Sequence, residues 1–185
     1  LTGTVSGLGG NDVFTLNANV SVALLSGGDN DDTFNLGDGV TPRALTGAID
    51  GGNGTDTVAG ADEYSLTGAN AGTSTRASGG FSNVENLTGT SGTDAFTVSG
   101  GSLTGTLNGA GGTDTLRNDT SYTVTGAGSG SSSAVNAWQG IENLQGTAGV
   151  DTFTFNSGGS ITGTASGLAG NDVFNLAGAV GGAMS

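Results

Sequence analysis

The chain has 185 residues, among them 39 glycines, a single proline and no cysteine or histidine, so neither disulfide bonds nor cysteine or histidine chemistry is available to it. Sixteen carboxylates against three arginines give a net charge of −13 at pH 7, which excludes nucleic acid and anionic membrane surfaces as partners because both need cationic side chains. No stretch approaches 18 consecutive apolar residues, so no transmembrane span and no direct membrane insertion are predicted.

The first element in the chain is a twelve-residue phrase, residues 5–16, with the sequence VSGLGGNDVFTL. It recurs seven times when copies are aligned on the aspartate, and a glycine stands five residues before that aspartate in every copy. The positions seven before and two after the aspartate are always apolar, which indicates a glycine turn between two strands. The seven aspartates are Asp12, Asp32, Asp56, Asp94, Asp114, Asp151 and Asp172.

The spacing of the phrases divides the chain into blocks. The differences between the numbers of successive aspartates are 20, 24, 38, 20, 37 and 21. The repeating unit is therefore about 20 residues long, and two units lack the aspartate turn. We expect two coils in 1–44, three-coil blocks in 45–102 and 103–160, and the start of a further super-repeat in 161–185. Segments 1–20 and 161–180 agree at 13 of 20 positions, so the super-repeat extends over 1–160.

The two unmarked units resemble each other and carry most of the large aromatic residues that lie outside the phrases. Tyr64 of the first unit is equivalent to Tyr122 of the second, and Phe81 is equivalent to Trp138. We predict that these four side chains plug wider turns in the core, and that the turns near residues 68–82 and 126–139 are irregular or bulging. The asparagines in Glu-Asn-Leu, Asn86 and Asn143, are predicted to hydrogen-bond backbone at corners.

Apolar residues alternate with polar ones, as in 32–36 and 151–155, and a period of two is typical of β-strands. A short unit of this kind can bury its apolar face only by stacking on its neighbours. The sequence therefore predicts an all-β fold, a single-stranded parallel β-helix (β-solenoid) of about nine coils forming one segment over 1–185. An antiparallel sandwich is the alternative. In the β-helix, five phenylalanines would share one interior column: Phe14, Phe34, Phe96, Phe153 and Phe174.

Stacking would also bring the seven aspartates into a column, with carboxylates about 5 Å apart, where like charges repel. Two interpretations remain open. Either each carboxylate accepts hydrogen bonds from the backbone N–H groups of its own turn, or calcium ions bridge neighbouring turns. Calcium is the one cofactor that the residues suggest. Its ligands would be Asp12, Asp32, Asp56, Asp94, Asp114, Asp151 and Asp172.

Two resemblances add to this interpretation. Residues 51–58, GGNGTDTV, resemble the Gly/Asp nonapeptide of the repeats-in-toxin family, which implies calcium in the turns. The coil length and composition of the whole chain resemble large repetitive bacterial surface adhesins with β-helical repeats, the filamentous-haemagglutinin-like proteins. That likeness implies a protein on the outside of a bacterial cell.

The expected function is structural. The chain has neither lysine nor histidine and its arginines fall at different positions in the coil, so we predict that it is not an enzyme. We expect an extracellular rod or filament segment of an adhesin, stalk or matrix fibre that continues or self-associates end to end. The alternative is a calcium-stiffened binding module whose outward Thr/Asn-rich face grips surface carbohydrate or ice.

Overall fold

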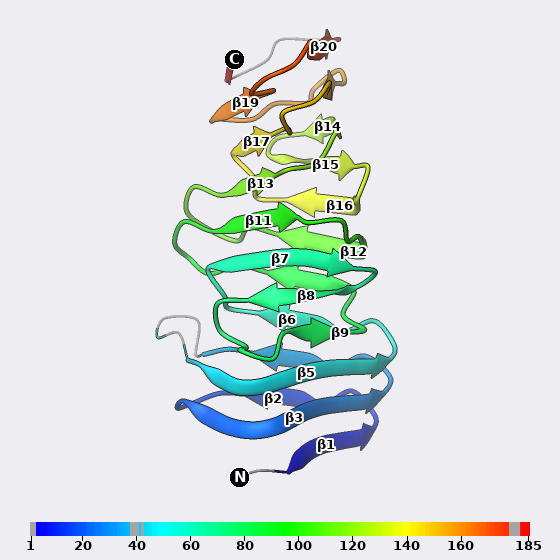
Figure 1. Cartoon of the computed structure of the whole chain (residues 1–185), viewed down its shortest axis with the longest axis vertical. Coiled ribbons are helices and arrows are strands. Elements are labelled where there is room, and N and C mark those ends of the chain that lie inside the picture. Colours follow the sequence, from blue (N-terminus) through cyan, green and yellow to red (C-terminus); the bar gives the residue numbers. More distant parts are fainter. Residues whose placement is uncertain (1–2, 38–40, 42, 178–181) are drawn as a thin grey trace.

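The computed structural model describes residues 3–37, 41, 43–177 and 182–185. In these residues the protein is all-β, and its strands form two long sheets that stack along the long axis of the molecule (Figure 1). Sheet A consists of β1 (Thr4–Gly9), β3 (Val20–Asp29), β5 (Leu45–Asn53), β7 (Glu63–Gly68), β8 (Ala71–Ser74), β9 (Phe81–Ser82), β11 (Ala95–Val98), β13 (Thr115–Arg117), β17 (Asn143–Gln145), β19 (Thr164–Ser166) and β21 (Ala183–Met184). Sheet B consists of β2 (Val13–Thr15), β4 (Thr33–Asn35), β6 (Thr57–Ala59), β10 (Asn86–Thr88), β12 (Leu103–Asn108), β14 (Ser121–Gly126), β15 (Ser129–Ser132), β16 (Val135–Gln139), β18 (Thr152–Phe155) and β20 (Val173–Leu176).

The chain passes back and forth between the sheets. One strand of sheet A and the next strand of sheet B form one circuit, and most strands pair in parallel with the equivalent strand of the next circuit. Phe14 therefore lies opposite Phe34, which holds the same position in the next phrase. This pairing explains the length of the sequence repeat, because one repeat is one circuit.

The core lies between the two sheets and runs the length of the stack. The strands between the end circuits turn their large apolar residues inward, and four of these are completely buried in successive strands of sheet B: Phe34, Val58, Leu87 and Leu107. Aromatic rings stack on one another between circuits, with centroids 4.9–5.5 Å apart. The stacked pairs are Phe14–Phe34, Tyr64–Phe96, Tyr122–Phe153 and Phe153–Phe174.

Two antiparallel hairpin insertions interrupt the alternation. After β6 the chain places β7, β8 and β9 side by side in sheet A, in the spatial order β5-β9-β8-β7-β11. Strands β14, β15 and β16 do the same in sheet B, between β12 and β18. The prediction of irregular or bulging turns near 68–82 and 126–139 is met only in part. Antiparallel strands occupy residues 71–74, 81–82, 129–132 and 135–139, whereas the strand register shifts just before residues 68 and 126. The prediction that Tyr64, Phe81, Tyr122 and Trp138 fill the core is confirmed.

The two similar blocks lie on opposite sheets. If each three-stranded insertion counts as one leg, residues 45–102 make five legs and end in sheet A, so residues 103–160 begin in sheet B. The predicted single phenylalanine column is wrong for this reason. Phe96 lies in sheet A, whereas the other four phenylalanines lie in sheet B: Phe14, Phe34, Phe153 and Phe174.

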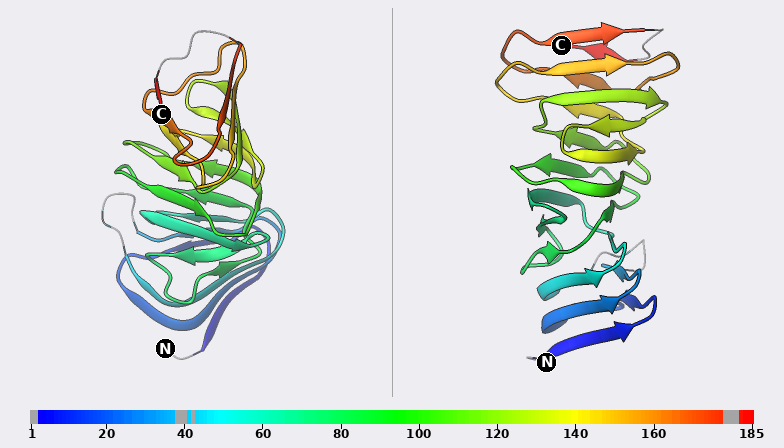
Figure 2. Two further views of the ribbon diagram at one scale, coloured as in Figure 1. Left: turned by 45° about the horizontal axis from the view of Figure 1, so that its top comes forward. Right: turned by 90° about the vertical axis from the view of Figure 1, so that its right-hand side faces the viewer.

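The insertions balance each other over one super-repeat. From β1 to β19, which begin at the equivalent positions Thr4 and Thr164, sheet A advances by nine strands. From β2 to β20, which begin at Val13 and Val173, sheet B also advances by nine strands. One insertion adds two strands to sheet A and the other adds two strands to sheet B, so the two sheets keep equal length along the stack. Figure 2 shows the resulting stack from two further directions.

Candidate functional site: the aspartate turns

The predicted aspartates form hydrogen-bonded ladders between circuits. The backbone N–H of Asp12 donates to Oδ1 of Asp32 over 2.8 Å, and the N–H of Asp32 donates to Oδ1 of Asp56 over 2.7 Å. The backbone carbonyl of each lower aspartate also accepts an N–H from the residue after the upper one. Asp32, Asp56, Asp114 and Asp172 thus each accept an N–H from the preceding turn of the ladder, and not from their own turn as the sequence predicted.

A glutamate ends a ladder where a hairpin insertion follows. The N–H of Asp56 donates to Oε2 of Glu85, and the N–H of Asp114 donates to Oε2 of Glu142, each over 2.8 Å. Glu85 also accepts a hydrogen bond from Nδ2 of Asn70 in the β7–β8 turn. Sequence reasoning missed both glutamates as ladder members, although the shared Glu-Asn-Leu of the unmarked units was the available signal.

The seven aspartates do not share one corner of the molecule. Asp94 and Asp114 precede strands of sheet A, and the N–H of Asp94 donates to Oδ1 of Asp114 over 2.8 Å. The N–H of Asp151 donates to Oδ1 of Asp172 over 3.0 Å, back on the corner that leads into sheet B. There are accordingly three separate ladders. Five aspartates precede sheet B strands: Asp12, Asp32, Asp56, Asp151 and Asp172.

The glycine five residues before each aspartate makes room for its carboxylate. A Cβ on Gly146 would lie 2.6 Å from Cγ and 3.0 Å from Cβ of Asp151, closer than real contacts allow. The same overlap with the aspartate side chain occurs in all seven turns, so the glycine column and the aspartate column are two halves of one structure. The glycines are Gly7, Gly27, Gly51, Gly89, Gly109, Gly146 and Gly167.

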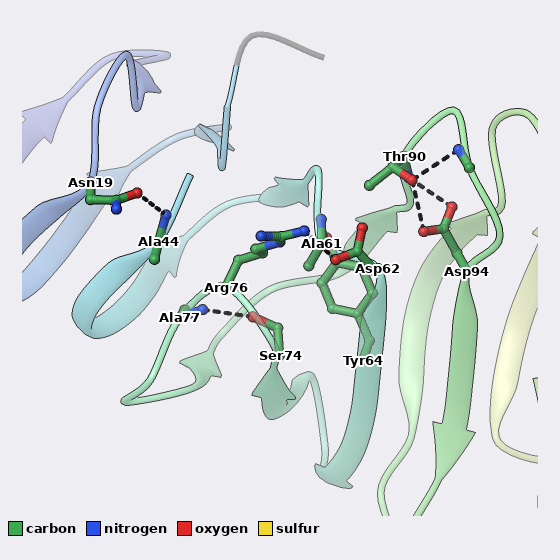
Figure 3. Close-up of polar contacts among 11 residues, drawn as sticks. Asn19, Ala44, Ala61, Asp62, Tyr64, Ser74, Arg76, Ala77, Thr90 and Asp94 are labelled. Carbon is green, nitrogen blue, oxygen red and sulfur yellow. Dashed lines mark hydrogen bonds and ion pairs between the residues drawn. The ribbon is translucent and has the colours of Figure 1, made fainter. Parts of the chain in front are cut away.

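In two of the turns the residue four before the aspartate is a threonine, whereas in the others that residue adopts the left-handed backbone conformation. In the Asp94 turn, Thr90 donates its N–H to Oδ2 over 2.8 Å and its hydroxyl to Oδ1 over 3.0 Å (Figure 3). Thr147 makes the same bonds to Asp151. In the other turns the equivalent residue has a positive φ, and in one it is Leu8 at 74°. The two carboxylates with threonine therefore have partners on both oxygens.

Four of the other ladder carboxylates each have a buried oxygen without a partner. Among the described residues, Oδ2 of Asp12, Asp32, Asp56 and Asp114 is buried without a hydrogen-bond partner. Burial raises the pKa of Asp114 to about 6; the N–H of Asp94 opposes this, while the negative charges of Asp94 and Glu142 add to it. Burial likewise raises the pKa of Asp56 and of Asp94. Folding thus holds several carboxylates in surroundings that disfavour their charge.

The ladders offer little to a metal ion. Calcium takes six to eight oxygen ligands, usually including several carboxylates. In the described ranges, no group of three or more Asp, Glu, His or Cys side chains is placed so that it could hold a metal ion. The ladders contain two or three aspartates each, and one oxygen of each upper carboxylate already accepts a backbone N–H. The calcium prediction is neither met nor excluded by this geometry, and it stays a prediction.

Each hairpin insertion is anchored by a buried tyrosine. The hydroxyl of Tyr64 accepts the N–H of Ala61 over 3.2 Å and donates to the carbonyl of Thr88 over 2.9 Å. Figure 3 shows this tyrosine beside the ion pair between Arg76 and Asp62. Tyr122 repeats the arrangement in the second insertion, with the N–H of Asp119 and the carbonyl of Gln145.

Sequence reasoning did not single out Asp119, the buried carboxylate at the base of the second insertion. It accepts the backbone N–H groups of Thr120 over 2.8 Å and Ala134 over 2.9 Å. The hydroxyls of Ser132 and Ser133 also donate to it. Asp119 lies outside the repeated phrase, and the equivalent residue of the first block is Ala61, so no pattern marked it. The predicted backbone bonds of Asn86 and Asn143 are confirmed, since both accept N–H groups from the next circuit.

A cleft of about 550 Å³ opens near the first insertion. Glycine backbone lines much of it, together with Leu36, Thr88 and Thr90. Among its described lining residues Asp62 is the one carboxylate, and it is already paired with Arg76. These lining residues therefore include no pair arranged as nucleophile and base or as acid and base.

No protein-family model, curated protein or solved structure matches the chain. Within the described residues there is also no helix long and apolar enough to cross a membrane. The case for a function therefore depends on the geometry of the two sheets and of the turns between them.

Proposed function

We propose that this chain is a segment of an extracellular structural rod on a bacterial surface, part of an adhesin, stalk or matrix fibre. In this proposal the two sheets are the faces of a β-solenoid, a single-stranded parallel β-helix whose coils are the circuits described above. The role of the rod is to provide length and stiffness, and it performs no catalysis. Its partners are further copies of the same repeat, joined end to end within a longer array or between chains.

The observation that carries this proposal is the equal advance of the two sheets. A single insertion would lengthen one face by two strands, about 10 Å, and bend the axis. The second insertion adds the same length to the opposite face, so one super-repeat begins and ends on the same sheet with both faces equal. A unit with this property can be repeated without accumulating curvature.

The ends of the stack are consistent with continuation. β1 and β2 at one end, and β20 and β21 at the other, each have one edge without a partner strand among the described residues. Phe14 and Phe174 are only partly buried, and both pack against the core from an end circuit. A further circuit at either end would cover one of these rings and pair the open edge.

Electron microscopy of tandem chains tests the proposal. Chains carrying residues 1–160 two, four and six times should form straight rods that lengthen by about 43 Å per repeat, which is nine strands at about 4.8 Å. Circular dichroism should show the same strand content per residue at every length. Rings, coils or globular particles whose length does not grow with repeat number would contradict the rod.

A second candidate is the binding module, with a Thr/Asn-rich face that grips carbohydrate or ice. The outer face of sheet B favours it, because β4, β6 and β10 carry Thr33, Asn35, Thr57 and Thr88 in adjacent rows. In its full form this candidate includes calcium bound at the aspartate turns as a stiffener. We rank it second because the hydrogen-bonded ladders already join the turns without an ion.

A further inference from the structure

The described strands of sheet B differ from those of sheet A in charge. None of the ten strands of sheet B contains Asp, Glu, Lys or Arg, although the chain carries a net charge of −13. The strands of sheet A do contain charged residues, namely Asp29, Asp50, Glu63 and Arg117. The other charged residues that the structure describes lie outside the strands, in the connections.

Short polar side chains cover the outer face of sheet B in rows. Phe34, Val58 and Leu87 point inward, so the residues on either side of them point outward. One row runs Val13, Thr33, Thr57, Asn86, and the next runs Thr15, Asn35, Ala59, Thr88, Asn108. Val13 is 68% exposed, and Val173, its equivalent in the next super-repeat, is 44% exposed. The two end strands of sheet B thus each place one exposed valine beside hydroxyl and amide groups.

We propose that this face docks against the same face of a second copy, so that two rods pair side by side through their sheets B. The inference deepens the proposed rod and depends on it only for the length of the contact. Two chains that each carry thirteen excess negative charges repel one another on most approaches. Approach through the two sheets B brings no charged strand residue to the interface.

The area of the face fits a contact whose affinity is low for one segment and high for several segments in tandem. Ten short strands cover roughly 48 Å by 12 Å, or about 600 Å² per copy and about 1,200 Å² in total. That area is the lower limit for a stable interface. The affinity should therefore be low for one segment and rise steeply with the number of tandem repeats.

The geometry of such a pair is that of packed sheets. Two β-sheets pack face to face about 10 Å apart with strands within about 30° of alignment. Threonine and asparagine at this spacing interdigitate and hydrogen-bond across the interface, and the exposed valines add apolar contact. Carboxylates at the corners stay outside the contact, where salt screens them over about 8 Å.

Thr57 and Thr115 give a matched test. Each follows a ladder aspartate, Asp56 or Asp114, and each is half-buried at the start of a three-residue strand. Thr57 lies in sheet B and Thr115 in sheet A. Thr57→Glu and Thr115→Glu therefore make the same charge change in the same local setting on opposite faces.

Sedimentation of the whole chain between about 10 and 500 µM provides the measurement. We expect the average mass of the unsubstituted chain and of Thr115→Glu to rise with concentration towards a dimer, and Thr57→Glu to weaken this at least fivefold. Because the chain has no cysteine, T57C and T115C can be treated with a short bismaleimide. T57C should give cross-linked dimers and T115C should not.

Three outcomes would overturn the pairing. A mass that stays that of the monomer at all concentrations would refute the pairing, and the proposed rod would then be tested only by the tandem-chain experiment. Association that both glutamate variants preserve equally would show contacts through the ends. Binding of a neutral polysaccharide that Thr57→Glu abolishes, without any change in mass, would make this face a glycan surface.

Discussion

Replacing Gly146 by alanine tests the link between the glycine and the aspartate columns. The three nearest atoms to the new methyl group all belong to Asp151, at 2.6 Å and 3.0 Å for its Cγ and Cβ. Overpacking of this kind typically costs about 1–3 kcal/mol. In the same turn, Gly149 would place its methyl 3.4 Å from the nearest atom, an ordinary contact, and its φ is not in the left-handed region. Both substitutions reduce the entropy of the unfolded chain equally, so their difference isolates the clash.

We expect Gly146→Ala to be less stable than Gly149→Ala by about 1–3 kcal/mol, the cost of the overlap. For a chain of this length that corresponds to a difference in Tm of roughly 2–12 °C. Thermal and urea unfolding followed by circular dichroism measure both quantities. The double variant Gly146→Ala/Asp151→Ala should lose less than the sum of its single changes, because removing the carboxylate gives the methyl group space. Equal stability of the two alanine variants, or strict additivity in the double variant, would refute the reasoning.

Three further predictions concern the same framework. Tyr64→Phe removes a hydroxyl that serves Ala61 and Thr88 and should cost about 1–3 kcal/mol in urea unfolding, whereas an unchanged midpoint would mean the anchor contributes nothing. The pKa of Asp114 is raised to about 6 by burial, so its protonated form favours folding; this contribution is present below the unfolded pKa and is lost as pH rises through about 6. The Tm should therefore increase from pH 8 to pH 5, and Asp114→Asn should flatten that increase, while a falling Tm over this range would contradict it. Finally, the Tm in millimolar calcium and in chelator distinguishes the two interpretations of the aspartates: ladders held by hydrogen bonds alone give equal values, whereas bound calcium raises the Tm by several degrees.

The local features of this protein could be read from its residues. Alternating apolar positions give strands, because only a period of two places Phe34 and Leu36 on one face of an extended chain. The glycine five residues before each aspartate could be identified as a turn residue, because both residues lie within one phrase. The N–H that Asp32 or Asp56 accepts belongs to the neighbouring circuit, so the phrase predicts the turn but not the ladder.

Only the tertiary structure decided which sheet each phrase occupies. The sequence of Asp56-Thr57-Val58 is nearly that of Asp114-Thr115-Leu116, yet the first strand lies in sheet B and the second in sheet A. The difference arises from the number of crossings that precede each strand, and that number depends on long-range pairings such as β9 with β5 and β7 with β11. Local sequence specifies a strand and its inward face, whereas its sheet is fixed by the strands already in place beside it. The glutamate ends of the ladders and the balance of the two insertions follow from the same stacking, so they emerge only when the circuits are assembled.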